Sequence, residues 1–181
     1  MSQPIQIRLS GAGGQGLQLS AHILAEALLR EGRTLAQSQS YEPTSRGGVS
    51  RSDLVVSDAA IDYPLVTALD FLIILDDVAA AASTALLGPD SVVLIDSARV
   101  PDAPEGNWTT HRFPCTDIAR SLGNERVANI VALGALAALG GLCPAATLEA
   151  VVREETPAKF AGLNLEALAA GGRLVEALAA A

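Results

Sequence analysis

A glycine-rich segment, Gly11-Ala12-Gly13-Gly14-Gln15-Gly16, stands between a strand-like and a helix-like stretch of the sequence. Residues 5–10 (IQIRLS) alternate apolar and polar side chains, and residues 17–30 place their apolar side chains broadly on one helical face. Glycines allow a tight turn and let a ligand approach the backbone amides at the start of a helix. In this context the match to G-x-G-x-x-G predicts a strand–turn–helix unit of an α/β fold.

The rest of the chain continues this alternation of strands and helices. Residues 69–75 (LDFLIIL) and 91–95 (SVVLI) are almost continuously apolar, which is typical of strands covered on both faces. Further strands are expected at residues 34–38, 49–57 and 108–112, and further helices at residues 78–87, 116–122, 127–139, 147–153 and 165–181.

This order of elements predicts a three-layer α/β/α sandwich with a mostly parallel, Rossmann-like sheet. Residues 49–57 and 61–63 are expected to add an antiparallel hairpin or edge strand, and residues 1–181 are expected to form a single domain. Ligands of such folds bind beyond the carboxyl ends of the strands. That rule directs attention to two loops, residues 11–16 and 39–48.

Composition and charge exclude several classes of protein. The chain carries a formal net charge of −8 with 12 Lys and Arg residues, and only 3% of its residues are aromatic. It therefore has neither the basic surface nor the stacking platform that nucleic-acid binding requires. Residues 127–148 carry no charge, but their glycines and Pro144 indicate a buried helix with its terminus rather than a membrane span.

The cysteines and the N-terminal residues indicate a cytoplasmic protein. Cys115 and Cys143 match no metal-site or cluster spacing, and small buried side chains are the simplest role for both. The first residues lack the basic start and apolar core of a signal peptide. Sparse cysteine usage fits a reducing compartment.

The first loop leaves three interpretations open. A nicotinamide-cofactor site requires an acidic residue at the end of the second strand, and none occurs before Glu42. The glycines could instead serve only tight strand–helix packing, or they could hold an anion or the backbone of a partner chain. The candidate residues in this loop are Gly11, Gly13, Gly14, Gln15 and Gly16.

The second loop combines hydroxyl groups, glycines and cations. Its candidate residues are Ser40, Tyr41, Arg46, Gly47 and Gly48. Arg46 is the better candidate for a forked contact to a carboxylate or phosphate, while Arg51 is expected on the exposed face of its strand, paired with Asp53. A solvated loop without a ligand remains the alternative.

The sequence contains no recognisable catalytic constellation. His22 and His111 lie outside both loops, and no Walker-type motif or metal-ligand cluster occurs. Asp76-Asp77 follows a buried strand, where capping of the next helix is the expected role. No residue of this chain alone is therefore assigned a catalytic or metal-binding role.

Several motifs together resemble the gamma subunit of the 2-oxoacid:ferredoxin (acceptor) oxidoreductases, most closely the 2-oxoglutarate type. The resemblance rests on the glycine-rich segment, on QSYEPTSRGG (residues 39–48), on SRSD (residues 50–53), on IDYP (residues 61–64) and on NIVALGALAAL (residues 129–139). In that family Glu42 is more often glycine, and Thr44-Ser45 is more often Glu-Ala.

The resemblance implies a role within a larger enzyme. Such enzymes decarboxylate a 2-oxoacid oxidatively to an acyl-CoA and pass electrons to ferredoxin, using thiamine diphosphate, Mg²⁺ and iron–sulfur clusters. This chain has no Gly-Asp-Gly motif and only two cysteines, so it would bind none of these groups alone. They would reside on alpha and beta partner subunits, with a delta subunit and a homodimer of the isolated chain as further candidates.

The two loops would then line a coenzyme A or substrate channel, or contact a partner subunit. Two other functions stay open at this point. One is a stand-alone NAD(P)-binding oxidoreductase, and the other is a non-enzymatic anion-binding module.

Overall fold

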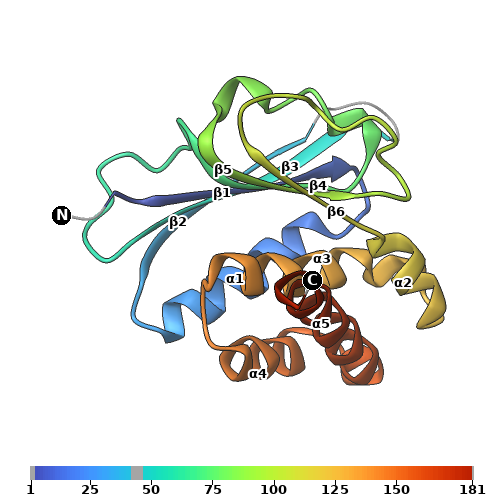
Figure 1. Ribbon diagram of the computed structural model, residues 1–181. Helices are drawn as coiled ribbons and strands as arrows, with labels where there is room; N and C mark the ends of the chain where they lie inside the picture. Colours follow the sequence, from blue (N-terminus) through green and yellow to red (C-terminus); the bar gives the residue numbers. More distant parts are fainter. Residues whose placement is uncertain (1–2, 42–46, 181) are drawn as a thin grey trace.

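The computed structural model describes residues 3–41 and 47–180 and is built around one six-stranded sheet. The strand order is β2-β3-β1-β4-β5-β6 (Figure 1). The strands are β1 (Ile5–Ala12), β2 (Thr34–Tyr41), β3 (Val49–Ser57), β4 (Leu69–Ile74), β5 (Leu87–Asp96) and β6 (Thr109–Phe113).

The sheet is mostly parallel, with β3 running against its neighbours. β1 pairs in parallel with β4, β4 with β5, and β5 with β6. β3 lies between β1 and β2 and is antiparallel to both. The expected antiparallel element is therefore present, but β3 pairs with β2 and β1 rather than with residues 61–63, which are irregular. Pro64 follows those residues and has no N–H to donate to a ladder.

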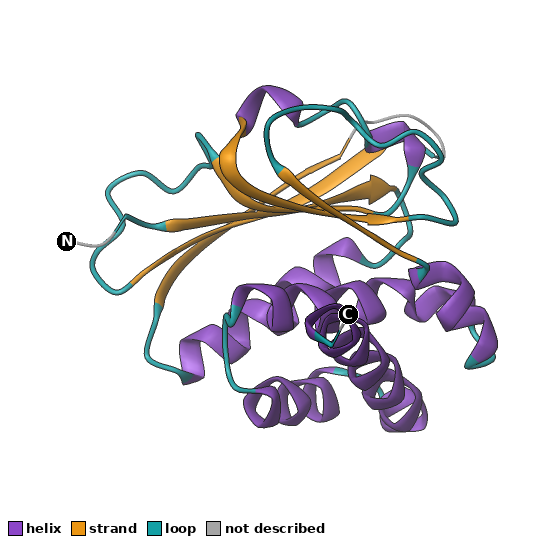
Figure 2. Cartoon of the chain, in the orientation of Figure 1, coloured by secondary structure: helices purple, strands orange, loops and turns teal. Residues whose placement is uncertain are grey.

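The five α-helices of the described residues all lie on one side of the sheet (Figures 1 and 2). They are α1 (Leu17–Arg30), α2 (Cys115–Ser121), α3 (Ala128–Gly140), α4 (Ala145–Glu155) and α5 (Ala158–Ala179). Of these, α1 and α3 lie against the sheet, and α4 and α5 lie farther out. The opposite face is covered by loops and by two short 3₁₀ turns, η1 (Asp77–Ala79) and η2 (Thr84–Leu86). The expected α/β sandwich is confirmed, and its layer on this second face is thin.

Residues 78–87 were expected to form a helix, but the structure has only the two 3₁₀ turns η1 and η2 there, joined by a turn over residues 80–83. Ser83 and Thr84 interrupt the run of alanines, and such side chains compete with the helical backbone for hydrogen bonds. The Ser83 hydroxyl is buried and accepts a hydrogen bond from Arg8 at 3.1 Å. A tertiary contact therefore prevails over the local helical preference of the alanines.

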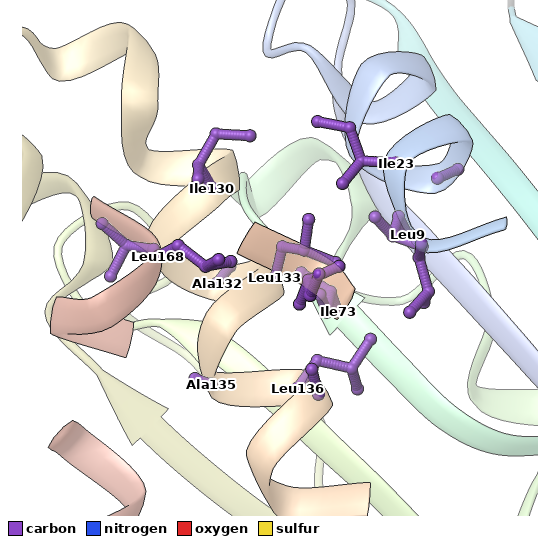
Figure 3. Packing of buried hydrophobic residues seen from close by; sticks show 14 of the residues in the cluster. Leu9, Ile23, Ile73, Ile130, Ala132, Leu133, Ala135, Leu136 and Leu168 are labelled. Carbon is purple, nitrogen blue, oxygen red and sulfur yellow. The ribbon is translucent and has the colours of Figure 1, made fainter. Parts of the chain in front are cut away.

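The main hydrophobic core lies between the sheet and the helices. Leu9 and Ile73 of the sheet cluster with Ile23 of α1 and with Leu133 and Leu136 of α3 (Figure 3). Nine residues of α3 are buried, which explains why this segment carries no charge. No helix in the described part of the chain is long and apolar enough to cross a membrane.

Helices α3 and α5 cross at two glycines. A Cβ atom on Gly134 would lie 2.1 Å from the carbonyl oxygen of Leu168, and one on Gly171 would lie 2.0 Å from that of Val131. The sequence predicts a helix over residues 165–181 that weakens at Gly171-Gly172, but α5 begins at Ala158 and continues through both glycines. Close packing against α3 compensates for their low helix propensity.

Candidate functional site

A cavity of about 400 Å³ opens at the carboxyl ends of β1, β4 and β5. The order of strands in the sheet reverses here: from β1 the chain continues through α1 to β2 and β3 on one side, whereas β4, β5 and β6 lie on the other side of β1. Ligands of α/β folds bind at such a point of reversal. The cavity is lined by Gly14, Gln15, Leu75, Asp96, Arg99, Thr116, Asn124, Glu125, Arg126, Ala128 and Asn129.

The first glycine loop contributes one wall of this cavity. Gly14 and Gly16 have φ values of +93° and +74°, a backbone conformation that disfavours other residues. Gly16 is the N-cap residue of α1, and no side-chain cap hydrogen bond is formed there. The predicted strand–turn–helix unit is present at these residues.

Gln15 spans the ends of β1 and β4. Its Oε1 accepts from the N–H of Ala12 at 2.7 Å, and its Nε2 donates to the carbonyl oxygen of Leu75 at 3.1 Å. A Cβ atom on Gly11 would lie 2.4 Å from Gln15 Oε1, so a larger residue at this position would displace the Gln15 amide. Gln15 and Gly11 thus brace the cavity wall.

The two glycine loops meet directly. The N–H of Gly13 donates to the carbonyl oxygen of Gly48 at 3.1 Å, next to the pairing of Ala12 with Val49. Gly47 is exposed and has a φ of +82°. The structure therefore brings together glycines that are about 35 positions apart in the sequence.

Of the remaining candidates in the second loop, Ser40 and Tyr41 belong to the described end of β2, and Arg46 does not belong to the described residues. Ser40 is exposed near the end of β2, and Tyr41 closes the ladder opposite Ser50. Arg46, the predicted forked donor, lies outside the described residues.

Asn129 is a site residue that sequence reasoning missed. It is buried, and its Nδ2 donates to the carbonyl oxygen of Gly16 at 3.0 Å and to the hydroxyl of Ser20 at 2.9 Å. A buried asparagine at the start of an otherwise apolar helix was the available signal. Asn129 ties the glycine loop to α3.

Charged side chains link the strand ends at the mouth of the cavity. Arg99 pairs with Asp76 at 3.4 Å and with Glu125, which also accepts from Arg120 at 2.9 Å. These hydrogen bonds, chiefly the one from Arg120, lower the pKa of Glu125. Arg126 is exposed at the cavity, and no ion pair joins it to any residue within 3–41 or 47–180.

Asp76 has two roles at this edge. It caps η1 by accepting from the N–H of Val78 at 3.4 Å, as its position predicts, and it also pairs with Arg99.

The buried carboxylate of Asp96 holds the start of α2. It accepts from the N–H of Thr116 at 3.2 Å and from the Thr116 hydroxyl, and it also accepts from the N–H of Ala98. The N-cap residue of α2 is Pro114, which makes no side-chain cap hydrogen bond of its own. The capping group comes from the neighbouring strand, so local sequence could not reveal it.

A second charged cluster lies on the face of the sheet away from the five helices. Arg8 forms two hydrogen bonds of 2.7 Å to the two carboxylate oxygens of Asp53, and both side chains are at least nine-tenths buried. The expected pairing of Arg51 with Asp53 is wrong, because Arg8 engages both oxygens of that carboxylate.

The described residues contain no group of three or more His, Cys, Asp or Glu side chains that could hold a metal ion. His22 contacts Glu155 in the helical layer, and His111 stacks on Phe113. Burial raises the pKa of both thiols, that of Cys143 to about 11. Around the cavity, the described residues provide hydrogen-bond donors, the cations Arg99 and Arg126, and glycine backbone that a ligand can approach closely.

The topology argues against a nicotinamide-cofactor site. In such sites the second strand lies beside the first, so that its terminal acid reaches the ribose. Here β3 separates β2 from β1, which places the end of β2 about 10 Å away, or two strand spacings. The fold and the site define an α/β domain with a ligand crevice beside a glycine-rich turn.

Comparison with known proteins identifies the family. The model of the pyruvate ferredoxin/flavodoxin oxidoreductase family matches residues 6–174. The 2-oxoglutarate synthase subunit KorC of Archaeoglobus fulgidus is 39% identical over 145 residues, which cover 80% of this chain and 75% of the relative. KorC of Methanocaldococcus jannaschii is 36% identical over 177 residues, covering 96% and 95% of the two chains.

A solved structure agrees in fold and sequence. The gamma subunit of a keto/oxoacid ferredoxin oxidoreductase from Geobacter sulfurreducens is 40% identical, with a TM-score of 0.83. The match covers 93% of this chain and 96% of that one. This chain therefore belongs to the pyruvate ferredoxin/flavodoxin oxidoreductase family.

Proposed function

We propose that this chain is the gamma-type subunit of a multi-subunit 2-oxoacid:ferredoxin oxidoreductase, with residues 1–181 forming a single gamma-type domain. The observation that carries the proposal is the family match over residues 6–174 together with near full-length similarity to a 2-oxoglutarate synthase subunit. The substrate proposed is accordingly 2-oxoglutarate, which the complex converts to an acyl-CoA while it reduces ferredoxin.

The redox chemistry is assigned to partner subunits. Iron–sulfur clusters need several thiolates, whereas both cysteines here are separate thiols whose pKa is raised by burial. Mg²⁺ prefers carboxylate oxygens, and the described carboxylates around the cavity are engaged with arginines or with the start of α2. The residues present do not fit these groups, so thiamine diphosphate, Mg²⁺ and the clusters belong to alpha and beta subunits, with a delta subunit as a further candidate.

The two glycine loops are proposed to face coenzyme A, the oxoacid or a partner backbone. The Gly13–Gly48 hydrogen bond makes them one continuous surface, and the cavity opens beside it. Exposed backbone at glycines can approach an anion or another chain closely. A cytoplasmic location is part of the proposal, since free thiols persist in reducing compartments.

Purification from the native source tests this function. The chain should co-purify with a thiamine-diphosphate subunit, and the assembled complex should oxidise 2-oxoglutarate faster than pyruvate, branched-chain oxoacids or aryl pyruvates. The isolated chain should oxidise none of them. Oxoacid oxidation by the isolated chain would refute the subunit assignment.

Two measurements address the rival functions. Titration of the purified chain with NADH and NADPH should give no micromolar binding, and such binding would favour the stand-alone oxidoreductase. A purified chain that never associates with a thiamine-diphosphate subunit would favour the anion-binding module. Size-exclusion chromatography of the isolated chain tests whether it forms a homodimer.

A further inference from the structure

A groove of about 610 Å³ lies on the outer side of the helical layer, away from the sheet (Figure 1). It runs between α5 and the neighbouring ends of α3 and α4, and most of its walls are small apolar side chains such as Ala138 of α3, Ala145 of α4 and Ala169 of α5. Leu178, which lies one turn after the groove residue Val175, is 47% exposed. The groove is therefore an apolar surface that no described element of the chain covers.

One wall of the groove contains a glycine that the chain itself does not require. Gly171 packs against the carbonyl oxygen of Val131, but no described atom lies within 4 Å of the position of a Cβ atom on Gly172. Glycine weakens the interior of a helix relative to alanine, and it lets another backbone approach closely. Gly172 is therefore suited to a contact from outside the chain.

The charged side chains at the groove carry both signs. Arg173 and Glu176 lie three positions apart on the exposed side of α5, and no ion pair joins either of them to a residue within 3–41 or 47–180. A partner surface of one sign would be attracted by one of these charges and repelled by the other. A second copy of α5 that runs in the opposite direction complements both charges.

We propose that this groove is the contact between two copies of the chain related by a two-fold axis. In such a contact, residue i of one copy meets residue j of the other, and j meets i. With the two α5 helices antiparallel, Arg173 of each copy meets Glu176 of the other, which gives two ion pairs. Gly172 lies beside these pairs and lets the two helices approach closely.

This contact leaves the ligand cavity open. Ala128 and Asn129 at the start of α3 line that cavity, whereas Ala137 and Ala138 near the end of the same helix line the groove. The two sites are therefore at opposite ends of α3. The pairing goes beyond the proposed function, and it leaves the crevice of each copy free for other subunits.

The mass of the full chain in solution tests the proposal. Sedimentation velocity over a range of protein concentrations should show a species with twice the mass of one chain, and dilution gives its dissociation constant. A chain that keeps the mass of a single copy at every concentration overturns the proposal.

Charge reversal tests whether Arg173 and Glu176 face each other across the axis. Arg173→Glu and Glu176→Arg each place like charges opposite one another, so each should raise the dissociation constant of the dimer about tenfold or more. The variant with both changes restores the two ion pairs and should dimerise as the unchanged chain does. A dimer that survives a single reversal, or that the double variant fails to restore, overturns the proposal.

Lys159→Glu is the matched control for Arg173→Glu. It makes the same change of charge on the same helix, but it lies outside the groove lining. Its distance from Arg173 along the helix axis is about 21 Å, from a rise of about 1.5 Å per residue. Its dissociation constant should be unchanged, and loss of the dimer in this variant would show that net charge controls association, which overturns the proposal.

Gly172→Gln tests the close approach of the two helices. Because no described atom lies near the position of its Cβ, the variant should keep the circular dichroism spectrum of the unchanged chain, with an equal or higher melting temperature. The longer side chain occupies the groove, so the dissociation constant should rise about tenfold or more. A folded variant that dimerises normally contradicts the contact.

Assembly distinguishes this contact from the proposed function. If the isolated chain stays single and Arg173→Glu fails to join the oxidoreductase, the groove binds another subunit and the proposal is overturned. A dimer that the double reversal restores, in a chain that joins no oxidoreductase, supports the contact and contradicts the proposed function.

Discussion

The side-chain amide of Asn129 donates to the carbonyl oxygen of Gly16, at 3.0 Å, across 113 positions of sequence. The same nitrogen donates to the Ser20 hydroxyl, so the glycine loop, α1 and the start of α3 are held by one side chain. The shape of the cavity beside β1 therefore depends on a residue that neither glycine motif contains.

Substitution of Gly16 by alanine should destabilise the protein and distort this loop. Gly16 has a φ of +74°, and a new Cβ atom would lie 2.6 Å from Asn129 Nδ2. Backbone strain of about 1–2 kcal/mol and the loss of a hydrogen bond worth about 1 kcal/mol should lower the free energy of unfolding by about 2–3 kcal/mol. Urea denaturation measures the change.

Gly14→Ala is the matched control for this prediction. Gly14 also has a positive φ, of +93°, but no atom lies within 4 Å of the position of its Cβ. The control should show the strain alone, about 1–2 kcal/mol. Equal losses in the two variants would show that the contact with Asn129 does not matter.

Breaking the buried Arg8–Asp53 pair should be costly. Asp53→Ala leaves the guanidinium of Arg8 buried without its carboxylate partner, since Ser83 is its one other described contact. Loss of one member of such a pair typically costs about 3–5 kcal/mol. Chemical denaturation should show this loss, whereas Asp102→Ala, an exposed acid on a loop, should change stability by less than about 0.5 kcal/mol.

A double variant separates the charge from the packing. Arg8→Met combined with Asp53→Leu removes both charges together, and similar replacements of buried pairs are often neutral or stabilising. The double variant should therefore be more stable than Asp53→Ala. If the double variant were as unstable as Asp53→Ala, the loss of stability would come from packing on this face of the sheet and not from the unpaired charge.

The crossing of α3 and α5 should not tolerate a methyl group. Gly134→Ala places its Cβ atom against the backbone carbonyl of Leu168, which a rotamer change cannot move away. Overpacking of this kind costs about 1–3 kcal/mol and sometimes more. Thermal or urea unfolding should show a clear loss of stability.

Gly162→Ala in α5 should raise the stability of the protein instead of lowering it. No atom lies within 4 Å of its Cβ position, so the substitution changes only helix propensity. It should stabilise the protein by up to about 1 kcal/mol. A stabilised Gly134→Ala variant would contradict the close approach of the two helices.

The regular elements of the fold could be predicted because their periodicity is local. The boundaries of α1 follow from the spacing of its apolar side chains, β3 follows from its β-branched residues, and β4 and β5 follow from almost unbroken apolar runs. Residues 78–87 were mispredicted because the buried contact of Ser83 with Arg8 joins positions 75 apart. α5 begins earlier than expected because Pro157 occupies its N-cap position, where proline needs no N–H partner.

The glycines of the candidate site were recognisable in the sequence, but the groups that fix them were not. Asn129, Asp96 and Arg8 act on residues 20 to 113 positions away, and their partners follow from strand order rather than from local pattern. The pairing of Arg51 with Asp53 was a reasonable expectation for two residues on one strand face. Strand order placed Arg8 directly opposite Asp53, and Arg51 forms no ion pair with any residue of 3–41 or 47–180.

The last prediction concerns the pH dependence of Cys143. Burial, with a smaller contribution from Glu31, raises the pKa of its thiol to about 11. At neutral pH the thiolate is scarce, so the folded protein should react with a disulfide reagent more slowly than a free thiol does. The reaction rate should keep rising with pH above the ordinary thiol pKa of about 8.5.

The same shift sets the sign of a stability change. Because the pKa of Cys143 is higher in the folded than in the unfolded chain, its contribution is present below the ordinary thiol pKa and is lost as the pH rises toward 11. Cys143→Ser should flatten the decline in stability measured by denaturation between neutral and alkaline pH. Cys115 is fully buried with a raised pKa, so it remains in that variant as the internal reference and should react only on unfolding. Rapid labelling of Cys143 at neutral pH would contradict the raised pKa of its half-buried thiol.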